Sequence, residues 1–98
     1  MNIANLQLEG LYLAIAATHR LLVEKGIVSR EELDTSLRRA EQVALGDYRT
    51  EELSGAERDA VAFAPRLLAL ANGAEDLPDF SALARAVGQT KGRYGDQQ

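Results

Sequence analysis

The stretch that most limits the fold is LLVEKGIVSREELDTSL, residues 21–37, because it combines the end of one helix with the start of the next. Gly26 follows an apolar segment and can adopt the left-handed backbone conformation that often ends a helix. Ser29 and Glu32 then have the spacing of a capping box, in which each side chain satisfies a backbone N–H group of the other. The stretch therefore predicts a tight turn between two helices.

The amino-acid composition favours helices throughout the chain. Ala and Leu dominate, whereas aromatic residues are few and Trp is absent, which disfavours a sheet. The length of 98 residues suits a single domain. We predict an all-α fold, a small bundle of three to four helices built on an N-terminal helical hairpin. Residues 1–88 would form the helical domain, and residues 89–98 a flexible C-terminal tail.

Local signals predict the bounds of the four helices. The first should cover about residues 3–25 and the second about residues 30–45, followed by a polar connection over residues 47–53. Ser54 and Glu57 form a second capping-box pattern, so the third helix should start near residue 55 and end at residues 72–73. Pro65 predicts a kink near residues 61–64, or two short helices meeting there. Asp79 should cap the fourth helix, and Gly88 should end it.

The first helix is apolar over much of its circumference. Two lines of apolar residues follow helical spacing. One consists of Leu8, Leu11, Ile15 and Leu22. The other consists of Leu6, Leu13, Ala17 and Leu21. The rest of so short a chain can cover one line but not both, and monomers seldom expose an apolar stripe of this length. We therefore expect the second line to be an interaction surface for another copy of the chain or for another protein subunit.

Charge and hydropathy exclude several classes of partner. Fifteen acidic residues against eleven basic ones give a net charge of −4, which argues against nucleic-acid binding. The longest apolar run, residues 11–17, is too short to cross a bilayer and lacks the basic flank of a signal peptide. We expect a cytoplasmic protein that binds neither nucleic acid nor membrane.

No pattern in the sequence indicates catalysis or a bound metal or cofactor. His19 is the single histidine and shares a helix flank with Tyr12, but no motif links it to a nucleophile or a carboxylate. The absence of cysteine excludes disulfides, thiolate catalysis and thiolate metal sites. The acidic run at residues 31–34 lacks the glycine and spacing of a calcium loop, and its residues suit helix capping. Arg38 and Arg39 form a basic pair that suits either a solvated helix face or an acidic partner.

The segment LLVEKGIVSREELD resembles the helical hairpin near the start of nitrile hydratase α subunits, in which a leucine-rich helix, an EKG turn and a capped second helix follow one another. The resemblance covers residues 21–41. It implies a hairpin that clasps a partner subunit, as such N-terminal arms do in that family. The metal site of the family is a cysteine cluster, which this chain lacks, so the resemblance implies no catalytic activity.

Two hypotheses of function follow from these observations. The first is a non-catalytic helical protein-interaction module, either a homodimer or a small subunit of a larger assembly. The alternative is a small-molecule-binding or enzyme accessory protein, with a pocket between helices near Tyr12 and His19. The apolar excess of the first helix favours the first hypothesis.

Overall fold

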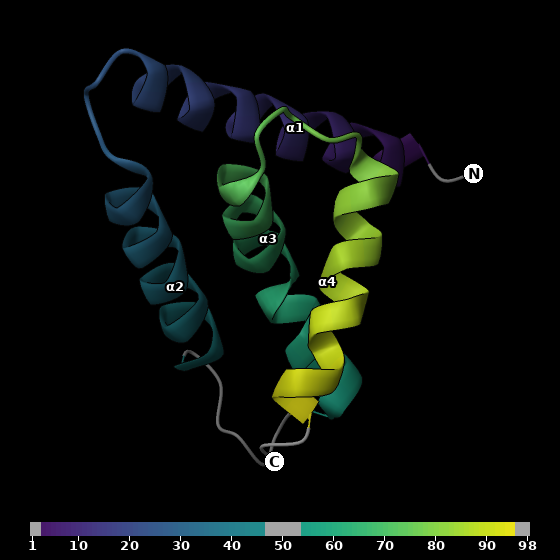
Figure 1. Ribbon diagram of the computed structural model, residues 1–98. Coiled ribbons are helices and arrows are strands. Elements are labelled where there is room, and N and C mark those ends of the chain that lie inside the picture. The colour runs from purple at the N-terminus through teal and green to yellow at the C-terminus, as the bar shows by residue number, and fades with distance from the viewer. Residues whose placement is uncertain (1–2, 47–53, 96–98) are drawn as a thin grey trace.

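The computed structural model describes residues 3–46 and 54–95 and contains four helices within them. The helices are α1 (Ile3–Glu24), α2 (Arg30–Gly46), α3 (Gly55–Gly73) and α4 (Phe80–Gly95). These residues form no strand, which confirms the predicted all-α class. α1 lies across one end of the other three helices, and α3 packs between α2 and α4 (Figure 1). In the described part of the chain, no helix is long and apolar enough to cross a membrane.

The turn between α1 and α2 has the predicted hydrogen bonds. Gly26 has a φ of 73°, and its N–H group donates to the carbonyl oxygen of Val23 at 2.9 Å. The N–H group of Ile27 donates to the carbonyl oxygen of Leu22 at 3.0 Å, which completes a Schellman motif. The capping box of Ser29 with Glu32 is also present, with distances of 2.8 Å and 3.0 Å. Beyond the turn the two helices diverge, and α2 packs along α3 instead of along α1 (Figure 1).

α3 is the central helix, and it contacts the other three helices. It begins with the predicted capping box, in which the Ser54 side chain accepts from the N–H group of Glu57, and the Glu57 carboxylate accepts from the N–H group of Ser54. The helix continues through Pro65 to Gly73, so the interpretation as two short helices is wrong. The kink at Pro65 stays a prediction.

The predicted end of the last helix at Gly88 is wrong, because α4 continues to Gly95. A glycine inside a helix costs about 1 kcal/mol relative to alanine. Gly88 does not have the positive φ of a glycine that ends a helix in the left-handed conformation. The predicted domain boundary at residue 88 thus falls inside a helix. The predicted mobility of the tail is untested, and its residues 96–98, like the connection over residues 47–53, lie outside the described residues.

The core lies between α1, α3 and α4. Its buried side chains come from all three helices and are Ala16, Leu67, Leu68, Ala71, Leu83 and Val87. Beside them, the rings of Tyr12, Phe63 and Phe80 pack with centroid distances of 5.8 Å to 6.2 Å. α2 contributes no fully buried residue to this core.

Polar contacts help to attach α2 to α3. Arg66 of α3 donates to the Glu41 carboxylate of α2 at 2.9 Å, and both side chains are largely buried. The side-chain amide of Asn72 donates to the carbonyl oxygen of Arg30 at 3.0 Å. These contacts add to the partial burial of apolar residues of α2, such as Leu37, which packs against the core.

Candidate interaction surface

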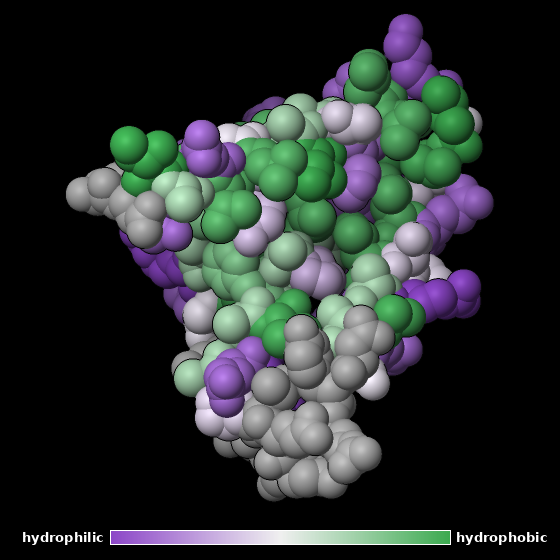
Figure 2. Space-filling view, turned by 180° about the vertical axis from the view of Figure 1, so that it is seen from behind, coloured by the Kyte–Doolittle hydropathy of each residue, from purple (hydrophilic) through white to green (hydrophobic). Residues whose placement is uncertain are grey.

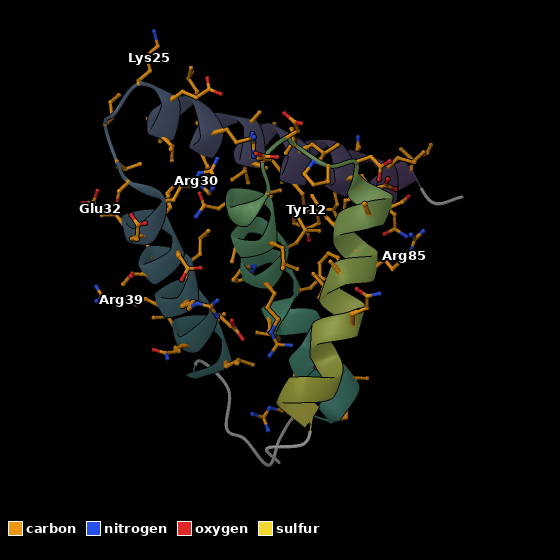
Figure 3. The ribbon with its side chains drawn as sticks, viewed as in Figure 1. Tyr12, Lys25, Arg30, Glu32, Arg39 and Arg85 are labelled. Atoms are coloured by element: carbon orange, nitrogen blue, oxygen red, sulfur yellow. The ribbon has the colours of Figure 1, made fainter. Side chains whose placement is uncertain are left out.

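The inner side of α1 faces the core and holds the helix across the end of α3. Ala16 is only 1% exposed, and Tyr12, one turn earlier, stacks on Phe80. One turn later, Arg20 reaches the segment that follows α3. Its guanidinium donates to the carbonyl oxygens of Ala71, at 3.2 Å, Ala74, at 3.1 Å, and Glu75. The Ala71 carbonyl also accepts from the N–H group of Ala74 at 3.3 Å, so Arg20 binds both the last turn of α3 and the segment that follows it. Figure 3 shows the Tyr12 side chain directed from α1 toward α3 and α4.

The outer side of α1 is apolar and exposed. Eight large hydrophobic side chains are exposed in the described residues, and five of them belong to α1, with exposed fractions between 44% and 72%. These five are Ile3, Leu6, Leu8, Leu11 and Leu21. The rear view in Figure 2 shows hydrophobic colour over much of the surface. Because most of these exposed hydrophobic side chains belong to one helix, α1 has the most apolar exposed surface of the described elements.

The outer side of α1 also carries no charge. Between Ile3 and Leu21, the exposed positions hold only apolar residues, glycine, threonine, asparagine and glutamine. The charged residues in this interval are Glu9, which is half-buried, and Arg20, which is bound to the end of α3. The exposed carboxylate of Glu24 lies at the very end of the helix. Docking of an apolar partner would therefore desolvate no charged group along most of the helix.

Three of the four predicted interaction residues lie on the surface. Leu6, Ala17 and Leu21 are exposed, whereas Leu13 is half-buried and packs against the core. A charged substitution at Leu13 would therefore disturb the fold as well as any interface. The role of these four residues in binding stays a prediction.

The expectation that the chain covers one complete apolar line of α1 is wrong. Leu8 and Leu11 of the other line are exposed, while Ile15 and Leu22 are half-buried. The first line is thus exposed in its N-terminal half and half-buried in its C-terminal half. In the second line only Leu13 is half-buried. The buried side of α1 is the flank with Tyr12 and Ala16, because the aromatic contacts and Arg20 hold that flank against α3 and α4.

His19 lies near the inner side of α1 and is half-buried. Its Nδ1 atom is enclosed and has no hydrogen-bond partner among the described residues. Desolvation by burial lowers the pKa of the imidazole below its ordinary value. A buried imidazole nitrogen without a partner favours the neutral ring.

Neither Tyr12 nor His19 lines the following three hollows. A cavity of about 30 Å³, roughly the volume of one water molecule, is lined by Arg20, Val23, Glu24, Arg30 and Asn72. Two further hollows are open depressions beside α2, lined mainly by its polar residues. These hollows give no support to the alternative of a ligand pocket near Tyr12 and His19.

The other polar candidates lie on the surface of α2. Arg38 pairs with Asp34 at 2.9 Å one turn earlier, and Arg39 is exposed. Glu32 caps the helix, as described above. Over residues 3–46 and 54–95, no three His, Cys, Asp or Glu side chains gather closely enough to hold a metal ion.

Sequence reasoning missed the polar residues that position α1 and α2. Arg20 follows Ala16 by one helical turn and Tyr12 by two, so the sequence predicts that the three residues share one face of the helix. No signal within the sequence connects Arg20 to a carbonyl group 51 residues away. The same is true of Asn72 and Arg30, which are 42 residues apart.

No protein-family model, no curated protein and no solved structure matches the chain. The resemblance of residues 21–41 to the nitrile hydratase hairpin therefore assigns no family. The class that fold and surface define is a small all-α protein with an exposed, uncharged helix face.

Proposed function

We propose that this chain is a non-catalytic protein-interaction module that docks through the outer side of α1. Its partner is a protein surface, either a second copy of the chain or another subunit of an assembly. The observation that carries the proposal is the row of exposed apolar residues from Ile3 to Leu21, uninterrupted by an exposed charge. A contiguous apolar area of this kind marks protein interfaces more often than free surface.

The lack of charge supports a protein partner in energetic terms. The central part of a protein interface is depleted in charged residues, because a charge that loses water without gaining a partner costs several kcal/mol. Each apolar Å² removed from water contributes about 25 cal/mol, although association costs offset part of this gain. Burial of the outer side of α1 would therefore remove apolar area from water over much of the helix without desolvating a charged group.

The inner side of α1 supports the proposal by holding the helix in a fixed orientation. Tyr12 packs against two aromatic rings, and Arg20 bonds to three carbonyl groups. A helix fixed in this way loses little conformational entropy when a partner docks on its other side.

The test compares charge at two exposed positions on different helices. Ala17→Glu places a carboxylate on the outer side of α1, and Val43→Glu places one on α2, where Val43 is 60% exposed. We expect the native protein to self-associate, or to co-purify with a defined subunit from its natural host. Ala17→Glu should abolish that association, and Val43→Glu should leave it unchanged. Light scattering and quantitative pull-down measure both.

Two results would contradict the proposal. One is a native monomer that co-purifies with no subunit. The other is an association that Ala17→Glu and Val43→Glu affect equally, because the interface would then lie elsewhere.

A further inference from the structure

We propose that the outer side of α1 binds a second copy of this chain, with the two α1 helices antiparallel around a two-fold axis near Gly10 and Ala14. The inference rests on the proposed function and names the partner and the orientation.

Six exposed positions of α1 form a straight seam along the helix. They are separated alternately by four and three residues, which is the spacing of residues that face a neighbouring helix. The seam consists of Ile3, Gln7, Gly10, Ala14, Ala17 and Leu21, all of them exposed. Leu6, Leu11 and Thr18, which are also exposed, flank this seam.

The seam is complementary to itself when one helix is reversed. In the antiparallel pairing Ile3 meets Leu21, Gln7 meets Ala17, and Gly10 meets Ala14. Large side chains then meet at both ends, and the smallest residues meet in the middle. Since every contact occurs twice around the axis, a single helix face supplies both halves of the interface.

Gly10 lies at the point where the two helices would approach most closely. A Cβ atom added to Gly10 would meet no atom within 4 Å, so packing inside the chain does not require glycine there. Glycine costs about 1 kcal/mol relative to alanine inside a helix. Contact between Gly10 and Ala14 of the two copies would explain a glycine at this position. Small side chains permit the helix axes to approach to about 8 Å, the shortest distance usual for packed helices.

Electrostatics favours this side of the molecule for pairing. Each copy carries a net charge of −4, so two copies repel each other in most orientations. Repulsion is smallest when the uncharged sides of α1 face each other. The antiparallel orientation also places each helix N-terminus near the C-terminus of its partner, where the helix dipoles attract.

The area available predicts a weak dimer. Residues 3–21 span about 27 Å at 1.5 Å per residue, and a helix face is on the order of 10 Å wide. Exposed Ile27 extends the apolar area at one end of α1. The area per protomer is below the roughly 800 Å² of a standard interface, so we expect a weak, reversible dimer.

Disulfide formation between introduced cysteines tests the orientation, since the native chain contains no cysteine. Gln7→Cys and Ala17→Cys are made as separate proteins, one with a mass tag, and mixed above the dissociation constant in a glutathione redox buffer. We expect the mixed disulfide to form rapidly. Neither variant should link efficiently to itself, because identical positions are about 15 Å apart along the axis, beyond disulfide reach.

Val43→Cys mixed with Ala17→Cys is the matched control, and it should give only background cross-linking. Rapid self-linking of Ala17→Cys would show a parallel pair and overturn the inference. A dimer by light scattering without the mixed disulfide would also overturn it. Gly10→Leu provides a second readout, because Gly10 is exposed and an added Cβ atom would meet no atom within 4 Å. We expect helicity to be unchanged while the dissociation constant rises at least about tenfold. An unchanged constant contradicts contact at Gly10.

The outcomes separate this inference from the proposed function. A native chain that stays monomeric, but binds another subunit in a manner that Ala17→Glu abolishes, overturns the inference and leaves the proposed function standing. A monomer with no Ala17-dependent partner overturns both.

Discussion

Ala16 and Ala17 are neighbours in the sequence and point about 100° apart around the axis of α1. Ala16 is buried among residues of α3 and α4, and Ala17 is exposed. The two positions have the same side chain, and both belong to an apolar stretch. Their difference shows that hydrophobicity alone does not decide which side of an apolar helix becomes the core.

The neighbours of each side explain the difference. The side of Ala16 also carries Tyr12 and Arg20, whose ring and guanidinium find specific partners on α3, α4 and the segment between them. The side of Ala17 carries mainly apolar groups, together with uncharged polar ones such as Gln7 and Thr18. The directional contacts of Tyr12 and Arg20 thus orient the helix, and the other side of α1 is exposed.

The largest predicted effect is that of a charge placed on each side. Ala16→Glu buries a carboxylate without a partner and should reduce the free energy of unfolding by more than about 3 kcal/mol. Ala17→Glu should change it by less than about 0.5 kcal/mol in the monomer. Urea unfolding followed by circular dichroism, at a concentration low enough for monomers, measures both. Equal effects would mean that the two sides of α1 are assigned wrongly.

The next effect concerns the anchor on the inner side. Arg20→Leu removes the hydrogen bonds to three carbonyl groups and should cost roughly 2 kcal/mol. Arg20→Lys is the matched control. Lysine keeps the charge but cannot form the planar fork, so we expect an intermediate loss. If both variants are as stable as the native protein, Arg20 does not hold α1 in place.

A smaller effect is expected at the turn that leads from α1 to α2. Gly26→Ala forces a Cβ atom into the left-handed region and should destabilise the protein by about 1 kcal/mol. Gly10→Ala, at an open helical position, should instead stabilise the monomer by about 0.5 to 1 kcal/mol. Thermal unfolding distinguishes these opposite signs, and a shared sign would contradict the backbone conformation of one of the two glycines.

The smallest effect is a dependence of stability on pH through His19. Burial lowers the pKa of His19 in the folded protein, so the unfolded chain takes up the proton first as pH falls. The contribution of neutral His19 to the free energy of unfolding is complete above the unfolded pKa of about 6.5. It is lost as the pH decreases toward the folded pKa. The native protein should lose more stability between pH 7 and pH 5 than His19→Gln. Identical pH profiles would indicate that the imidazole is solvated in the folded state.

The candidate surface was predictable only in part. Periodicity alone identified Leu6, Ala17 and Leu21, which the structure exposes, but it also included Leu13, which packs against the core. Periodicity records which residues share a side of a helix. It does not say where the rest of the chain will lie, and for α1 that position depends on contacts with residues more than 50 positions away.

The sequence by itself determined where most helices begin and where the first turn lies. Gly26, the two capping boxes and Asp79, whose carboxylate accepts from the N–H group of Ala82, satisfy backbone groups within five residues along the chain. Such hydrogen bonds join residues that are close in the sequence, so the local pattern is enough to predict them. The tertiary structure decided the continuity of α3 through Pro65 and the side of α1 that faces inward. Each of these depends on burial against segments far along the chain, which outweighs local preferences of about 1 to 3 kcal/mol.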